Sequence, residues 1–148
     1  MKVKAKKHLG QHFLKDASIC QRIVDSIPLE KTQNVLEIGP GTGALTKWLL
    51  DEKKIKSLFL MDVDQESIAY LNHVFPELSE RILLTDFLHF NIDEFLENEP
   101  FNVVGNFPYN ISSQILFRCL DFKDRIPEIV GMFQREVAQR IAQGPGNK

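Results

Sequence analysis

Short runs of strand-forming residues alternate along this chain with segments whose apolar residues recur at helical spacing, which sharply limits the possible folds. Five strands are predicted, at residues 34–38, 57–61, 81–85, 101–105 and 127–133. Helices are predicted at residues 16–27, 65–74, 92–97, 112–120 and 134–143, with one more that carries Leu45, Trp48 and Leu49. Repeated strand–helix units favour an α/β fold, a parallel sheet with helices on both faces. In such sheets, ligands bind beyond the carboxyl ends of the strands.

The composition is that of one folded domain. Of the 148 residues, 43% are hydrophobic and 26% are charged, which excludes a mainly disordered chain. No apolar run approaches the roughly 20 residues of a membrane span, and the lysine-rich start lacks the apolar stretch of a secretion signal. Cys20 and Cys119 stand alone, without the spacing of a zinc site or a disulfide framework. We therefore expect a soluble cytoplasmic protein, monomeric and without a metal ion.

The net charge of −2 conceals an uneven distribution along the chain. Residues 1–15 carry five lysines and no acid, residues 16–109 have a net charge of −9, and residues 110–148 have a net charge of +2. A basic arm ahead of an acidic body can steer a polyanion such as RNA to one edge of the protein. A frayed, solubilising N-terminus explains the same pattern equally well, so charge alone leaves both interpretations open.

A glycine-rich turn, Glu37-Ile38-Gly39-Pro40-Gly41-Thr42-Gly43, follows the first predicted strand. Glycines let the backbone turn sharply and let a ligand approach the main chain, and the following helix N-terminus favours an anionic group. The turn loosely matches the dinucleotide-binding pattern, but the spacing E-x-G-x-G-x-G is more typical of S-adenosylmethionine sites. We take Gly39 and Gly41 as candidate cofactor-binding residues.

Acidic residues follow the second and third predicted strands. Asp62 ends the second strand, where a carboxylate can accept hydrogen bonds from both ribose hydroxyls of a bound nucleoside. Asp64 is more simply a helix N-cap. Asp86 ends the third strand and can accept from an adenine amino group, while the Phe87 ring covers a face of the base. As an isolated residue, Asp86 is equally well explained as a cap.

The fourth predicted strand leads into Asn106-Phe107-Pro108-Tyr109, the most informative tetrad of the chain. An amino group conjugated to a purine is a poor nucleophile because its lone pair is shared with the ring. The side-chain oxygen of Asn106 and the backbone carbonyl of Pro108 can accept its two hydrogens and free the lone pair. Tyr109 can stack on a base that has been flipped out of its helix. These residues predict a catalytic site for methylation of a planar amine, and an ordinary Asn-Pro turn is the alternative interpretation of the tetrad taken alone.

Two terminal segments are further candidates for contacts with ligands. The segment Lys7–Leu14 can fold over the cofactor as a lid, with His12 or Gln11 in polar contact and Phe13 or Leu14 as an apolar cover. The simpler alternative to a lid is that Phe13 and Leu14 are core residues and that His12 is solvated. The predicted helix 134–143 can present arginines to RNA phosphate, or it can be an ordinary solvated face.

Taken together, these stretches resemble the ribosomal RNA small-subunit adenine dimethyltransferases. The matching stretches are Gly10–Leu14, Val35–Gly43, Asp62–Asp64, Asp86-Phe87, Gly105–Ser112 and Gln134–Arg140. The resemblance implies a Rossmann-like methyltransferase sheet that uses S-adenosylmethionine. It also implies the placing of two methyl groups on each of two adjacent adenosines near the 3′ end of small-subunit RNA, within an immature subunit.

Carried over by position, the resemblance implies cofactor contacts by His12, Leu14, Gly39, Asp62, Asp86 and Asn106, with Asn106 also holding the target amino group. His12 replaces the commoner Asn, Asp62 replaces the commoner Glu, and Phe107 replaces the commoner Leu, whose role is packing. Family members continue through two more strands and a mostly helical C-terminal domain that grips RNA. Because this sequence stops at Lys148, we expect a catalytic domain truncated before that part.

Three alternatives remain at this point. One is a methyltransferase of another planar amine, such as DNA adenine or a protein glutamine. Another is a non-catalytic RNA-binding assembly factor that keeps the fold, although its cofactor loop and tetrad are intact. A dinucleotide oxidoreductase is the third, but the Asn-Phe-Pro-Tyr tetrad has no role in hydride transfer.

Overall fold

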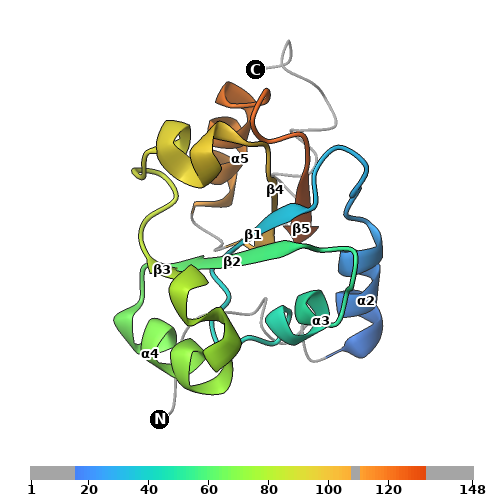
Figure 1. Cartoon of the computed structure of the whole chain (residues 1–148), viewed down its shortest axis with the longest axis vertical. Coiled ribbons are helices and arrows are strands. Elements are labelled where there is room, and N and C mark those ends of the chain that lie inside the picture. The colour runs from blue at the N-terminus through green and yellow to red at the C-terminus, as the bar shows by residue number, and fades with distance from the viewer. Residues whose placement is uncertain (1–15, 108–110, 133–148) are drawn as a thin grey trace.

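The computed structural model describes residues 16–107 and 111–132, and a five-stranded parallel sheet organises them (Figure 1). The strands are β1 (Asn34–Ile38), β2 (Ser57–Asp62), β3 (Ile82–Leu84), β4 (Asn102–Asn106) and β5 (Ile129–Met132). Their order across the sheet is β3-β2-β1-β4-β5, and every neighbouring pair is parallel. The predicted α/β sheet is therefore confirmed.

Helices cover both faces of the sheet. They are α2 (Ala17–Asp25), α3 (Thr46–Leu50), α4 (Gln65–Val74), α5 (Ser112–Asp121) and the 3₁₀ segments η2 (Pro76–Arg81) and η3 (Ile92–Asn98). Helices α2, α3 and α4 lie on one face, and α5 and η3 lie on the other (Figure 1). Because side chains alternate along a strand, Val35 of β1 joins the core beneath the first group, and Leu36 joins the core beneath the second.

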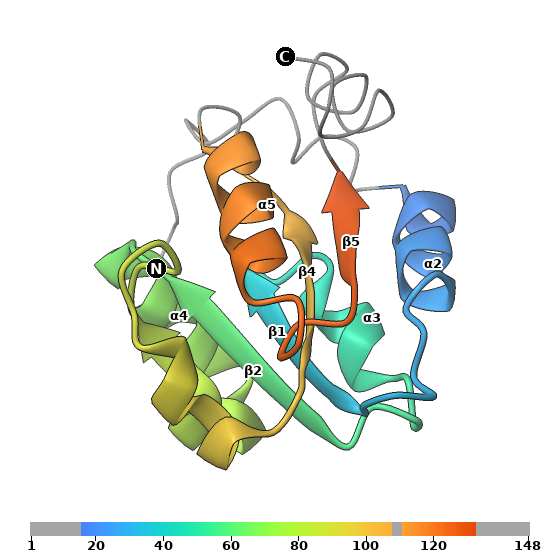
Figure 2. The ribbon, with the colours of Figure 1, turned by 90° about the horizontal axis from the view of Figure 1, so that it is seen from above.

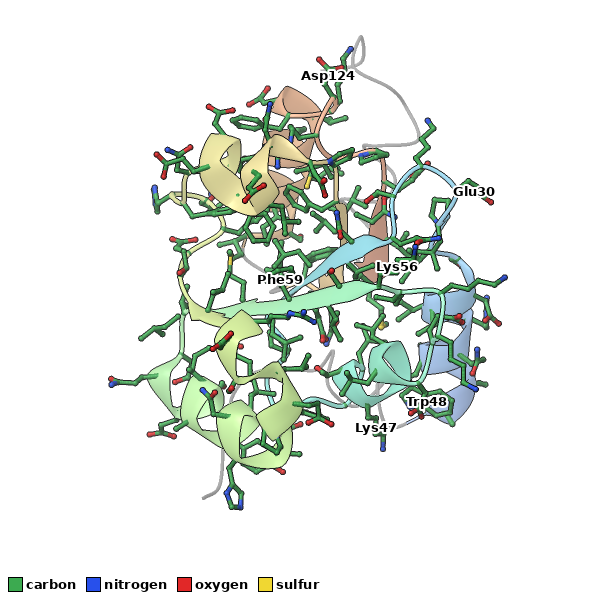
Figure 3. The ribbon with its side chains drawn as sticks, viewed as in Figure 1. Glu30, Lys47, Trp48, Lys56, Phe59 and Asp124 are labelled. Atoms are coloured by element: carbon green, nitrogen blue, oxygen red, sulfur yellow. The ribbon has the colours of Figure 1, made fainter. Side chains whose placement is uncertain are left out.

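Aromatic rings fill much of the core beneath α5 and η3. Phe95 makes edge-to-face contacts with Phe59, Phe90 and Phe101, with ring centroids 5.2, 5.6 and 5.0 Å apart. Phe59 projects from β2 toward this face of the sheet (Figure 3). Such pairs stabilise a core by about 0.5–1.5 kcal/mol each beyond the area that they bury. This layer fixes the segment that links β3 to β4.

The element ends follow local chemistry. Asp16 caps α2 as predicted, because its carboxylate accepts from the Ser18 N–H at 2.9 Å, but the helix ends at Asp25 rather than at residue 27. The predicted helix 92–97 is a broken 3₁₀ segment, since Leu96 and Glu97 have positive φ. The guanidinium of Arg125 binds the carbonyls of Ile92, Phe95 and Glu99 and thereby stabilises that irregular backbone.

The strand limits differ slightly from the predicted ones. β5 begins at residue 129 instead of 127, and residue 133 lies outside the described residues. β3 spans residues 82–84 instead of 81–85, with η2 occupying residues 76–81 before it, and β4 spans residues 102–106 instead of 101–105. The predicted helix 134–143 lies outside the described residues. Both cysteines are buried as expected, and burial raises the pKa of the Cys119 thiol to about 12. In the part of the chain that the structure describes, no helix has the length and apolar character needed to cross a membrane.

Candidate cofactor and catalytic site

The predicted site residues that the structure describes converge on one edge of the sheet. All strands run in the same direction, so their carboxyl ends meet there (Figure 2). Gly39 follows β1 directly, Asp62 ends β2 and Asn106 ends β4. The register pairs Ile38 with Met61 on one side and with Gly105 on the other, which places these three residues on neighbouring chain ends. This edge is therefore the candidate site.

The glycine turn after β1 has the backbone conformation that its composition predicts. Gly39, Gly41 and Gly43 have φ values of +67°, +59° and +84°, in the left-handed region that side chains disfavour. A Cβ on Gly43 would lie 2.5 Å from the Phe75 ring, so this position also excludes a side chain sterically. The Gly39 N–H donates to the carbonyl of Met61 at 2.8 Å, which attaches the start of the turn to β2.

Asp62 connects the glycine turn to the start of α4. Its carboxylate accepts from the Gly41 N–H at 3.3 Å and from the Asp64 N–H at 3.0 Å, and the residue is only 7% exposed. Asp64 caps α4 as expected, accepting from the Glu66 N–H at 3.1 Å and from the Ser67 hydroxyl at 3.1 Å. A carboxylate has about four lone-pair sites, so Asp62 keeps acceptor capacity beyond these two bonds. Its ribose contact stays a prediction.

Asp86 lies in a tight turn over residues 86–90 after β3. One carboxylate oxygen accepts from the Leu88 N–H at 2.9 Å, and the backbone carbonyl of Asp86 accepts from the N–H groups of His89 and Phe90 at 3.0 Å. The other oxygen lies 3.6 Å from Nε2 of His89, and 40% of the Asp86 side chain is exposed. One acceptor of Asp86 is therefore reachable from solvent near the ends of β2 and β3.

The predicted stacking role of Phe87 is wrong. Its ring is 3% exposed and packs against Phe90, because the turn that starts at Asp86 rotates it into the core. Val63 and Leu84, which we did not single out from the sequence, are instead 67% and 51% exposed beside Asp62. The sequence holds no signal that separates Val63 from Phe87, because both are apolar residues that directly follow a strand-ending acid. The side chains of Val63 and Leu84 offer an apolar surface to a flat base.

Glu37, one residue before the end of β1, is a buried acid that we did not single out as a site residue from the sequence. It is 1% exposed, and its Oε1 accepts from the Thr46 hydroxyl at the start of α3, at 2.5 Å. Burial raises the pKa of Glu37 to about 8; the hydrogen bond from Thr46 opposes this rise, and the charge of Asp62 adds to it. At neutral pH the carboxyl is mostly protonated. A lone Glu in an apolar strand ahead of a glycine turn was the available signal.

Asn106 is half-buried at the end of β4, and Phe107 beyond it is 6% exposed in the core, so the expected packing role of Phe107 is confirmed. Pro108 and Tyr109 lie outside the described residues, as do His12, Leu14 and the rest of the proposed lid. Their roles stay predictions. Among residues 16–107 and 111–132, no three potential metal ligands come together.

Comparisons with known proteins identify the family of this chain. The family model for ribosomal RNA adenine dimethylase matches residues 2–148. The chain is 55% identical over 147 residues to the ribosomal RNA small subunit methyltransferase A of Flavobacterium johnsoniae, covering 99% of this chain and 56% of the relative. It is 52% identical over 149 residues to the protein of the same name from Porphyromonas gingivalis, covering 100% of this chain and 57% of the relative. The chain thus spans a little over half the length of these relatives.

Solved structures show the same fold. The 23S rRNA methyltransferase ErmE superposes with a TM-score of 0.66 at 28% identity, over 84% of this chain and 48% of that one. A dimethyladenosine transferase from Plasmodium falciparum superposes with a TM-score of 0.65 at 27% identity, over 86% of this chain and 45% of that one. The family model and the similar relatives show that the chain belongs to the ribosomal RNA adenine dimethylase family.

Proposed function

We propose that this chain binds S-adenosylmethionine at the carboxyl edge of its sheet and dimethylates the N6 amino groups of two adjacent adenosines near the 3′ end of small-subunit ribosomal RNA. Family membership supports the reaction class, and the convergence of Gly39, Asp62 and Asn106 on one edge is the observation that carries the proposal. Bacterial ribosomes assemble in the cytoplasm, so we infer that the protein acts there, as a monomer on an immature subunit.

The described residues fit an adenosyl group. Gly39 and Gly41 carry no Cβ that would keep a ligand from the main chain. Asp62 can accept from the ribose hydroxyls, and the open oxygen of Asp86 can accept from the adenine amino group. Val63 and Leu84 can cover a face of the base, because their exposed side chains lie near both acids. His12 and Leu14 would close the site from the N-terminal side.

When bound, S-adenosylmethionine supplies a methyl group on a sulfonium sulfur and leaves as S-adenosylhomocysteine. Asn106 and the Pro108 carbonyl would accept the two hydrogens of the target amino group and turn its lone pair toward the methyl carbon. Tyr109 would stack on the flipped base. Transfer would form the bond between the amino nitrogen and the methyl carbon as the bond between that carbon and sulfur breaks, and the nitrogen would then lose a proton to water. None of these residues has to act as a strong base.

The test is methyl transfer from radiolabelled S-adenosylmethionine to immature small subunits. Asn106→Ala should abolish transfer, while calorimetry should still detect binding of S-adenosylhomocysteine. Asn72→Ala is the matched control, because Asn72 lies on α4 and its amide donates to the Ile68 carbonyl of its own helix. Full activity of Asn106→Ala would contradict the assignment. RNA binding without any transfer by the unmodified chain would favour an assembly factor, and transfer to DNA or a glutamine peptide alone would favour another amine.

A further inference from the structure

Arg118 of α5 holds the turn that carries Asp86. Its two terminal nitrogens donate to the backbone carbonyls of Leu88 at 2.7 Å and Phe90 at 2.6 Å. The guanidinium carbon also lies 5.9 Å from the centroid of the Phe90 ring and 5.3 Å from that of Phe122. Within the described residues, the partners of this cation are carbonyls and rings rather than carboxylates.

The planar fork of an arginine fixes the spacing of the two carbonyls that it binds, which a lysine ammonium cannot do. Leu88 is the middle residue of the turn and Phe90 is its last residue, so one rigid group holds the second half of the turn against α5. Hydrogen bonds from a charged donor are stronger than those between neutral groups. Two such bonds from one rigid group can therefore determine the shape of a short turn.

The turn that Arg118 binds also orients Asp86. The Leu88 carbonyl shares its peptide plane with the N–H of His89, and that N–H donates to the Asp86 carbonyl at 3.0 Å. By binding the Leu88 carbonyl, Arg118 therefore sets the direction of the His89 N–H and holds the backbone of Asp86. The Leu88 N–H donates to one carboxylate oxygen of Asp86, and the other oxygen lies 3.6 Å from Nε2 of His89 on a side chain that is 40% exposed.

We propose that Arg118 is a positioning residue for recognition of the adenine base. By clamping residues 86–90 onto α5, it aims the open oxygen of Asp86 at the 6-amino group of the cofactor. This inference rests on the proposed function, because it takes Asp86 as the acceptor for adenine. Arg118 would thus act through Asp86 and not touch the cofactor itself.

Arg125 provides a matched control within the same layer. Its guanidinium also donates to backbone carbonyls, those of Ile92, Phe95 and Glu99, and it lies 5.5 Å from the centroid of the Phe101 ring. It is 8% exposed. Loss of Arg125 should therefore destabilise the fold at least as much as loss of Arg118. It should leave the turn over residues 86–90 bound to α5.

Calorimetric titration of the 148-residue chain with S-adenosylhomocysteine and with S-inosylhomocysteine tests the proposal. The inosine analogue carries an oxygen in place of the 6-amino group, so the unmodified chain should prefer the adenosine ligand by about tenfold or more. Arg118→Met should reduce this preference to within about threefold. Arg118→Lys should keep part of it. Arg125→Met should lower the melting temperature and leave the preference unchanged.

Each outcome supports or overturns the inference. A full preference in folded Arg118→Met, or an equal loss in Arg125→Met, overturns it while the proposed function stands. Failure of the unmodified chain to bind S-adenosylhomocysteine overturns both. If Arg118→Met does not fold, amide hydrogen exchange of Arg118→Lys tests the inference instead. Faster exchange of the Leu88 and Phe90 amides, with α2 unchanged, supports the clamp, and unchanged exchange overturns it.

Discussion

The carboxylate of Asp62 accepts a hydrogen bond from the backbone N–H of Gly41 at 3.3 Å, across 21 residues of chain. This bond joins the end of β2 to the turn that follows β1, and the second oxygen of the same carboxylate binds the N–H of Asp64. Asp62 is thus both a proposed ligand for ribose and an internal support of the glycine turn. Its substitution should affect the two roles together.

Asp62→Asn should lower the affinity for S-adenosylhomocysteine about tenfold or more. Both carboxylate oxygens face backbone N–H groups, so the amide nitrogen of an asparagine would oppose one of them and lose a hydrogen bond to a charged acceptor. Calorimetry measures the loss. Asp64→Asn is the control, because the Asp64 carboxylate accepts from the Glu66 N–H and the Ser67 hydroxyl at the start of α4, and it should change the affinity little. Equal losses in the two variants would contradict the role of Asp62.

Glu37→Gln should change how stability depends on pH. Burial raises the pKa of Glu37 in the folded chain to about 8, above its value of about 4.5 in the unfolded chain, so the folded state retains the proton longer. The stability that this carboxyl contributes is fully present below pH about 4.5 and is lost as the pH rises to about 8. The unmodified chain should therefore lose free energy of unfolding across this window.

In Glu37→Gln this part of the pH dependence should be absent, because the amide has no proton to lose. Urea denaturation at a series of pH values measures the difference between the two chains. Thr46→Val is a second variant at the same site. It removes the hydroxyl that binds Glu37 and should destabilise the fold by about 1–3 kcal/mol. Parallel stability curves for Glu37→Gln and the unmodified chain would show that Glu37 is ionised in the folded state.

The position of Asp62 could be predicted from the sequence, whereas the protonation state of Glu37 could not. Each of the residues Gly39, Asp62 and Asn106 lies at or next to a strand end, and the parallel strands bring those ends to one edge, so their convergence could be predicted from the chain alone. The state of Glu37 depends on how completely its surroundings exclude water. The sequence pattern does not give that quantity.

The direction of the Phe87 ring and the contacts of Arg118 could not be predicted from the sequence either. The ring of Phe87 is turned inward by hydrogen bonds within the turn that begins at Asp86, and that geometry has no distinct sequence signal. Arg118 contacts carbonyls that lie 28 and 30 residues earlier in the chain. Helical periodicity identifies α5 but does not show which segment packs against it.

Gly131→Ala should destabilise the sheet next to Asn106. A Cβ on Gly131 would lie 2.1 Å from the backbone oxygen of Gly105 and 2.5 Å from the Phe107 ring, and a backbone atom cannot move aside as a flexible side chain can. Overpacking of this kind costs about 1–3 kcal/mol or more. Val130→Ala, on the same strand, removes methyl groups without a clash and should cost about 1 kcal/mol.

Thermal denaturation compares the stability of these two variants. A methyl-transfer assay measures the effect on activity. Met132 of β5 pairs with Asn106 of β4, so a displaced β5 would also move the end of β4 that carries Asn106. Gly131→Ala should lose more activity than Val130→Ala when both are assayed well below their melting temperatures. Similar stability and activity in the two variants would show that the strands accommodate the extra carbon.

Gly43→Ala combines two separable effects, and a double variant can separate them. The φ of +84° strains any residue with a Cβ by roughly 1–2 kcal/mol, and the added carbon would lie 2.5 Å from the Phe75 ring. Phe75→Leu shortens the side chain that is hit and leaves the backbone angle as it is. The double variant should therefore recover the steric part of the loss but not the conformational part. Denaturant unfolding of the four proteins gives a coupling energy, which should be favourable by about 1 kcal/mol or more. Strict additivity would mean that the Phe75 ring already moves away in Gly43→Ala, so that the left-handed backbone of the turn alone requires glycine there.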